Sequence, residues 1–270
     1  SHPELYRAAE EAKVALGLEN PITIYQAQHV NDLNAALYYI PGEGHVVLSG
    51  PVLSLLSYDE LKAVLGHELA HYCLWQIEGG DFLVADRLLQ AVVQDHRAEP
   101  SHVQSLRWFQ LYREVYADRG SLIAAEKIEA AVAGLVKMMT GLQQVSGASY
   151  LKQAEEVFQQ SQVKTSGLSH PEAFIRARAL QLWAEQDPDT EAAIRQMIEG
   201  TAGLDELDLL GQTLLTTTTR QFLEAFLRPQ WFHTEPVLAH AKLFFNDFKA
   251  GALSGAPPLV VEPRLKNYFC

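Results

Sequence analysis

Strand-forming sequence in this 270-residue chain is confined to the part before Ser49. There, β-branched and alternating residues predict three short strands, over 21–27, 35–40 and 45–48. From Ser49 to about Ala250 nearly every segment has helical spacing, and no second strand-rich block follows. We therefore expect an α+β fold that is mostly α-helical, with a small N-terminal β-sheet and extra helices toward the C-terminus.

The helical part divides most naturally at Gln186-Asp-Pro188. We expect one domain over 1–186 and a C-terminal helical appendage over 187–270. The appendage ends in a Pro-rich tail that contains the apolar Leu259-Val-Val261. Such a tail could pair with an exposed sheet edge and restrain access to the first domain. Alternatively, the appendage is a stabilising cap.

Charge and cysteine content narrow the range of partners. The chain has 33 acidic and 21 basic residues, a net charge of −12, which disfavours binding to nucleic acids or anionic lipids. Two cysteines, Cys73 and Cys270, make no disulfide framework, so we expect a cytoplasmic protein, or a periplasmic or other extracytoplasmic one if a signal segment was removed. The sequence contains no run of 18 or more apolar residues, so it predicts no transmembrane segment.

The strongest chemical signal is the pentapeptide His67-Glu-Leu-Ala-His71. It lies in a predicted helix over 58–76 that begins at the capping box Ser57-Tyr-Asp-Glu60. Histidines four residues apart share one helix face, so both rings can reach one metal ion, and Glu68 can take a proton from a water on that metal. The alternative is a pair of partly exposed histidines and a solvated glutamate that bind no metal.

A catalytic zinc needs a third protein ligand, and Glu114 is the best candidate. In Tyr112-Arg-Glu-Val-Tyr-Ala-Asp118 the carboxylates of Glu114 and Asp118 lie on one helix face. One can bind zinc while the other accepts a hydrogen bond from the free ring N–H of a ligand histidine. Three competing third ligands rank lower: His45, His96 and His102.

Together, His67-Glu-Leu-Ala-His71 and Glu114-Val-Tyr-Ala-Asp118 resemble the motifs of gluzincin zinc metallopeptidases of the HtpX and CAAX-prenyl-protease type, peptidase family M48. The resemblance covers about residues 20 to 180. Its flanking matches are Asp59-Glu-Leu-Lys-Ala-Val-Leu-Gly66, Asn34-Ala35, His45-Val-Val-Leu-Ser49, and Ser169-His-Pro-Glu172 with Arg176.

The resemblance implies a zincin-like peptidase core with one Zn²⁺ per chain. His67, His71 and Glu114 would be its ligands, Glu68 the general base, and Asp118 the partner that orients a zinc histidine.

In the downstream segment the resemblance implies that His170 helps to stabilise the oxyanion and that Arg176 supports nearby carboxylates. His170 could equally be an ordinary residue beside Pro171. Many family members carry transmembrane helices around the catalytic domain, and this sequence departs from them in showing none.

We therefore expect a zinc-dependent metalloendopeptidase that cleaves extended or unfolded polypeptides lying beside the strand pair of 35–48. The first alternative is a non-catalytic or latent, chaperone-like peptide-binding scaffold, although a structural zinc would not need Glu68. The second is a helical interaction protein without zinc. The expected partner is a peptide or unfolded protein, not a nucleic acid, and the oligomeric state is left open.

Overall fold

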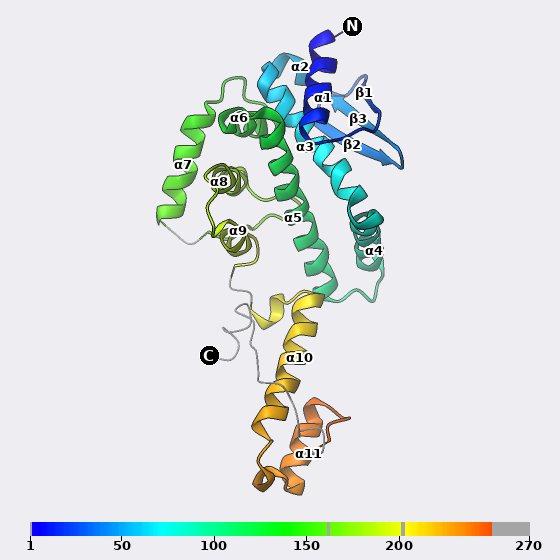
Figure 1. Cartoon of the computed structure of the whole chain (residues 1–270), viewed down its shortest axis with the longest axis vertical. Coiled ribbons are helices and arrows are strands. Elements are labelled where there is room, and N and C mark those ends of the chain that lie inside the picture. The colour runs from blue at the N-terminus through cyan, green and yellow to red at the C-terminus, as the bar shows by residue number, and fades with distance from the viewer. Residues whose placement is uncertain (1, 161–162, 201–202, 250–270) are drawn as a thin grey trace. The chain divides into compact units, whose positions relative to one another are not determined.

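The computed structural model describes residues 2–160, 163–200 and 203–249 (Figure 1). Its strands are β1 (Ile22–Gln26), β2 (Asn34–Ile40) and β3 (Glu43–Ser49). Its α-helices are α1 (Pro3–Ala15), α2 (Val52–Leu55), α3 (Tyr58–Gln76), α4 (Asp81–Gln94), α5 (Pro100–Ala125), α6 (Ile128–Thr140), α7 (Gly147–Gln160), α8 (Ala173–Ala184), α9 (Thr190–Ile198), α10 (Leu209–Phe226) and α11 (Glu235–Phe244). Short 3-10 helices are η1 (Ile77–Gly80), η2 (Leu204–Glu206) and η3 (Gln230–Phe232). The predicted α+β, mostly helical fold with a small N-terminal sheet is confirmed.

The sheet has the strand order β1-β3-β2. β3 pairs in parallel with β1 and antiparallel with β2, so the strand pair of 35–48 is a hairpin of β2 and β3. In the described part of the chain β2 has no second neighbour. Its outer edge therefore leaves backbone N–H and C=O groups available for pairing.

The first hydrophobic core lies between the sheet, α1 and α3. Val46 and Leu48 of β3 alternate inward and are fully buried, as a half-buried strand requires. They meet Leu65, Leu69 and Tyr72, which share one face of α3. This packing fixes α3 beneath the sheet.

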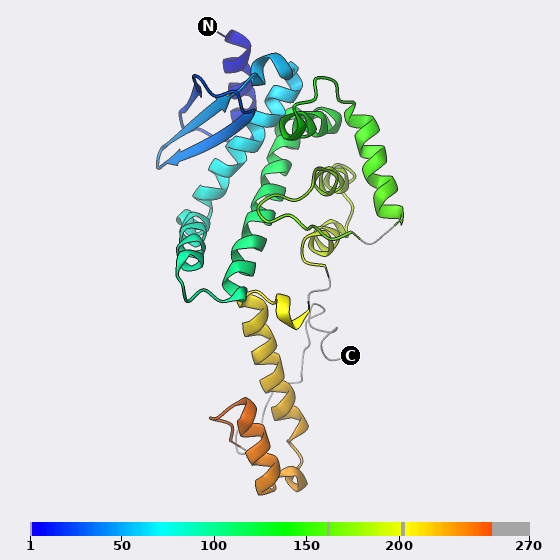
Figure 2. The ribbon, with the colours of Figure 1, turned by 180° about the vertical axis from the view of Figure 1, so that it is seen from behind.

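A second core joins α6, α7 and α8 to the opposite side of α3 and to the end of α5. Val132 and Leu180 are its most buried branched residues, and Ala63 and Ala125 connect it to α3 and α5. The part of α5 after Leu106 runs between α3 and the group of α6, α8 and α9 (Figures 1 and 2).

The start of α3 is fixed by the predicted capping box. The Ser57 N–H donates to Glu60 Oε2 at 2.7 Å, and Ser57 Oγ accepts from the Glu60 N–H at 3.5 Å. Lys137 of α6 donates to the same Glu60 oxygen at 2.7 Å in a buried ion pair. One carboxylate thus both caps α3 and ties it to α6.

Contacts divide the chain into two compact units, one of residues 1–96 and 106–200, the other of 97–105 and 201–270. The helix α9, which the sequence would assign to the appendage after 186, belongs to the first unit and packs on α8. In the second unit α10 and α11 share a small core of Leu227, Ala241 and Phe248. The Pro-rich tail expected to act as a lid or cap lies outside the described residues.

The helix predicted over 58–76 agrees with α3. The start of α10 is set by Asp208, whose side chain accepts from the Gly211 N–H at 2.8 Å. α11 stops at Phe244, where Phe245 takes an extended conformation. Within the described ranges no helix combines the length and apolarity needed to cross a bilayer.

Two glycines let α3 and α5 cross at close range. A Cβ on Gly66 would overlap Ala124 Cβ and lie 2.8 Å from the Gly120 carbonyl oxygen. A Cβ on Gly120 would overlap Ala70 Cβ and lie 2.9 Å from the Gly66 carbonyl oxygen. The backbones therefore touch one residue before His67 and two residues after Asp118.

Replacing Gly66 by alanine should lower the free energy of unfolding by about 1–3 kcal/mol, because the added methyl group forces the two helices apart. Chemical denaturation followed by circular dichroism measures the change. Gly203→Ala is the control, since its φ is −75° and its Cβ would meet nothing within 4 Å. Wild-type stability in Gly66→Ala would show that the crossing is not tight.

Candidate metal centre

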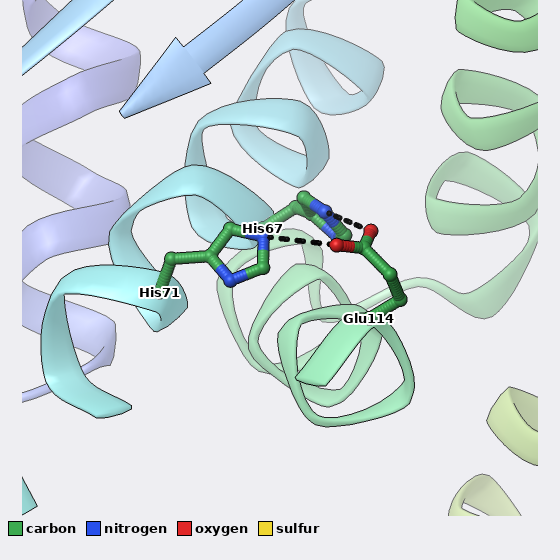
Figure 3. Close-up of side chains that lie close together, drawn as sticks. All are labelled: His67, His71 and Glu114. Carbon is green, nitrogen blue, oxygen red and sulfur yellow. Dashed lines mark ion pairs between the residues drawn. The ribbon is translucent and has the colours of Figure 1, made fainter. Parts of the chain in front are cut away.

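Three side chains from two helices converge at this crossing (Figure 3). His67 and His71 lie one turn apart on α3, and Glu114 faces them from α5. Glu114 Oε2 lies 3.4 Å from His67 Nε2, and Glu114 Oε1 lies 3.7 Å from His71 Nε2. One donor atom from each residue falls within 4.8 Å of the other two, so the three could hold a metal ion.

Asp118 lies one turn beyond Glu114 and contacts the outer nitrogen of His67. Its Oδ1 is 3.1 Å from His67 Nδ1, and this leaves Nε2 directed at Glu114. Arg176 of α8 donates to Asp118 from both Nε and Nη2, at 2.7 and 2.6 Å. The fork holds the carboxylate in one orientation, and the carboxylate in turn holds the ring.

Burial and charge act in opposite directions on the two histidines. Burial lowers the pKa of His67, but its contacts with Asp118 and Glu114 raise that pKa to about 10. Burial, and to a smaller extent the charge of the nearby His67, lower the pKa of His71 to about 3. Without a metal ion, the protonated His67 ring is the cation between the two carboxylates. A metal ion at Nε2 would take over this role and displace one proton.

The carboxylates carry more charge than their protein partners balance. Burial raises the pKa of Glu114 and of Asp118, but the cations around them hold both below their usual range. With Glu68 ionised, three carboxylates face the buried guanidinium of Arg176. A second guanidinium, that of Arg113, contacts Glu114 but also pairs with the buried Asp86. With Asp86 included, four carboxylates face two guanidiniums, so two negative charges remain when the histidines are neutral, which a divalent cation would balance.

Glu68 lies in the same pocket and differs in its acidity. Burial, opposed by His67, the Leu37 backbone N–H and Arg176 and aided by Glu114, raises the pKa of Glu68 to about 7. A carboxyl group with a pKa near neutral can both take and return a proton.

A pocket of about 180 Å³ opens beside this cluster. Its polar side is formed by His67, Glu68, Glu114, Asp118, His170 and Arg176. Its apolar side is formed by Leu33, Ala35, Val64, Leu135, Met138 and Met139. The pocket is therefore bounded by the β2 edge on one side and by α6 on another.

The structure brings His170 to the cluster from outside any helix. His170 precedes α8, and its Nε2 lies 3.6 Å from Glu114 Oε2. Its side chain keeps 55% of its surface exposed, so it stands at the pocket mouth. The sequence-predicted residues Glu68, Asp118, His170 and Arg176 thus all line one pocket with His67 and Glu114.

The lower-ranked candidate ligands lie elsewhere. His45 contacts Tyr25 and Glu43 on the sheet, and His96 is 89% exposed. His102 accepts from the Glu99 backbone N–H at 3.0 Å.

The outer ring nitrogens of the two histidines are held differently. Asp118 serves His67 alone. His71 Nδ1 is buried and has no hydrogen-bond partner within the residues that the structure describes.

Sequence reasoning missed Arg113 and the apolar wall of α6. Arg113 Nη2 lies 3.6 Å from Glu114 Oε1, and its Nη1 lies 3.3 Å from Asp86 Oδ1 on α4. Arg113 precedes Glu114 in the sequence, but helix spacing alone does not show whether its side chain points toward the metal centre or away from it. Met138 and Met139 are neighbours in an apolar helix, and nothing in the sequence distinguishes them from its other apolar residues.

Comparison of the sequence with known proteins finds a similarity to one peptidase family. The sequence model of Peptidase family M48 matches residues 1–76, which include His67, Glu68 and His71 and stop before Glu114. Over 199 residues the chain is 27% identical to the plastoglobule-localized metallopeptidase 48, chloroplastic, of Arabidopsis thaliana. That alignment covers 67% of this chain and 57% of the relative. No solved structure matches the chain.

Arg176→Met should lower the free energy of unfolding of the metal-free protein by about 3–5 kcal/mol at pH 7, because it removes the guanidinium that contributes most to balancing the buried Asp118 carboxylate. Arg176 lowers the pKa of Asp118, so its stabilisation exists above the unfolded pKa and is lost as the pH falls. In the variant only His67 still opposes the effect of burial, so the pKa of Asp118 is higher than in the wild type. The gap to wild type should therefore shrink as the pH falls toward about 4 and below.

Denaturant titrations between pH 3 and 7 measure this gap, with Arg178→Met on the same helix as the matched control. A destabilisation that does not change with pH would contradict the assigned Asp118–Arg176 pair.

Proposed function

Starting from the similarity of residues 1–76 to Peptidase family M48, we propose that this protein is a zinc-dependent metalloendopeptidase acting on extended or unfolded polypeptides. The observation that carries the proposal is the place of Glu68. Its buried carboxyl group shares one pocket with the donor set of His67 and Glu114, beside the outer edge of β2, which pairs with no other strand in the described part of the chain. A site that only held a structural ion would have no use for this group or for the open pocket.

Two histidines and one glutamate are a donor set of catalytic zinc sites, which leave a further position open. Zinc bound there would polarise a substrate carbonyl and lower the pKa of a water molecule. Asp118 keeps the Nδ1 proton of His67 in place, so the ring presents its Nε2 lone pair to the ion.

Glu68 is proposed as the general base and acid. Its pKa, raised by burial to about 7, suits a group that accepts a proton from the attacking water and passes it to the leaving amine. His170 Nε2 stands at the pocket mouth and can donate to the oxygen of the reacting carbonyl.

The substrate is proposed to add to the outer edge of β2. An extended peptide can use the free N–H and C=O groups of that edge, which pair with main chain whatever the side chains. Leu135, Met138 and Met139 line the same pocket as Asn34 and Ala35 at the start of β2, so we expect an apolar substrate side chain near the cleaved bond. A folded segment could not present its backbone in this way.

For the compartment we propose the cytoplasm, on cysteine use alone. Cys73 is a free thiol, and an isolated thiol is ordinary in a reducing compartment.

The isolated protein, loaded with zinc and then dialysed, should retain one zinc ion per chain. Glu114→Ala should weaken zinc binding by more than the 10–100-fold that loss of an outer partner typically costs, because it removes a direct ligand. Elemental analysis and a competition titration measure both. Glu129→Ala, an exposed glutamate on α6, is the control. Full zinc retention in Glu114→Ala would contradict the ligand set.

Glu68→Gln should keep the zinc and the fold but lower hydrolysis of an unfolded casein by about 10²–10⁴-fold, because an amide cannot accept the proton. Glu129→Gln should cleave at the wild-type rate. If Glu68→Gln cleaves as fast as wild type, the peptidase proposal fails. If neither protein cleaves while peptide still binds, a peptide-binding scaffold is the better description.

A further inference from the structure

The segment that brings His170 to the pocket has no regular secondary structure and lies against α5. Arg107 of α5 donates to two of its carbonyl oxygens. The Arg107 Nε contacts the Gly167 oxygen at 2.8 Å, and its Nη2 contacts the Thr165 oxygen at 3.0 Å. A guanidinium fork that binds two carbonyls fixes their spacing as well as their position.

Glu172 closes the other end of the same segment. Its Oε1 accepts from the Ser166 N–H at 3.0 Å and from Ser166 Oγ at 2.7 Å, while its Oε2 accepts from Thr165 Oγ1 at 2.7 Å. Although burial raises the pKa of Glu172, these donors lower it below its ordinary value, so the carboxylate is charged at neutral pH. Arg107 thus binds the carbonyl oxygens of the turn that starts at Thr165, and Glu172 binds hydrogen-bond donors of the same turn.

Between these contacts the chain folds back on itself. A Cβ on Gly167 would overlap the His170 carbonyl oxygen and lie 3.2 Å from Thr165 Oγ1. The Gly167 N–H donates to that same Thr165 oxygen at 3.1 Å. Only a residue without a side chain allows this approach, and it sets where His170 leaves the turn.

Arg107 and Glu114 are seven residues apart on α5, which places them two turns apart on the same face. One rigid helix thus carries both the metal-site carboxylate and the fork that holds the His170 segment. Ser169 Oγ lies 2.9 Å from His170 Nδ1, and the other ring nitrogen faces Glu114. The ring orientation follows from the turn.

We propose that Arg107 and Glu172 are positioning residues for His170: they hold the turn from Thr165 to Glu172 that presents the His170 ring to the pocket. The inference rests on the proposed function for its kinetic part, because His170 is there the donor to the developing oxyanion. A donor already in place when the substrate arrives stabilises the transition state without further ordering.

The kinetic test is a double-mutant cycle in the zinc-loaded full chain. His170→Ala should lower kcat by about 10²-fold, as loss of one oxyanion donor does. Arg107→Met should lower kcat at least about tenfold with little change in KM, and it should have no further effect when His170 is already alanine. Arg107→Lys should recover part of the rate, since one ammonium can still reach a carbonyl.

Arg119→Met, an exposed arginine on the same helix, is the matched control and should leave kcat unchanged. Zinc content is measured for every variant. Arg107→Met should bind zinc as wild type does, because none of the three ligands lies in the turn. Equal losses from Arg107→Met in the presence and absence of His170 would overturn the proposal, because that result describes a general structural role.

Amide hydrogen exchange tests the turn without any reference to catalysis. The Ser166 and Gly167 amides, which donate within the turn, should exchange at least about tenfold faster in Arg107→Met and in Glu172→Gln, with α8 protected as in wild type. Unchanged exchange in both variants would overturn the proposal. If the wild-type protein hydrolyses nothing, the proposed function fails, and the exchange rates still decide whether these residues hold the turn.

Discussion

The contact of α3 with α5 at Gly66 and Gly120 is the constraint on which the rest of the site depends. Because the backbones touch there, a residue next to Gly66 on α3 and residues near Gly120 on α5 face each other across one or two side-chain lengths. His67 Nε2 and Glu114 Oε2 can then approach within 3.4 Å, although both side chains are carried by helices and neither by a loop. Donors carried by two packed helices need little reorganisation to bind a metal ion.

The second constraint on the site is the charge of its buried carboxylates. Glu114 and Asp118 are nearly inaccessible to solvent, so their charges require compensation within the protein. Arg176 supplies part of it through a fork to Asp118 and lies 3.8 Å from Glu114. This arrangement leaves a net negative pocket in which His67 is held by its hydrogen bond to Asp118. Such a pocket attracts a divalent cation. Its ligand side chains keep their orientation when the ion leaves, because protein contacts hold them.

The sequence was sufficient for features that depend on spacing within one element. Histidines four apart and carboxylates four apart each had to share a helix face, and the hairpin of β2 and β3 followed from alternation around a turn. Contacts between distant elements were beyond such reasoning: no pattern links Glu60 to Lys137, or Arg107 to a turn sixty residues later. Likewise, the four threonines from Thr216 look unfavourable for a helix, yet hydroxyls of three of them bond to carbonyls one turn back within α10.

The central claim is that two helices bring two imidazoles and one carboxylate to a single zinc ion. X-ray absorption spectroscopy of the zinc-loaded protein at the zinc edge tests this most directly. We predict two nitrogen ligands at about 2.0–2.1 Å from imidazoles and oxygen ligands at about 2.0–2.2 Å, with no sulfur. A sulfur shell at about 2.3 Å, or a shell of oxygen alone without imidazole scattering, would contradict the account.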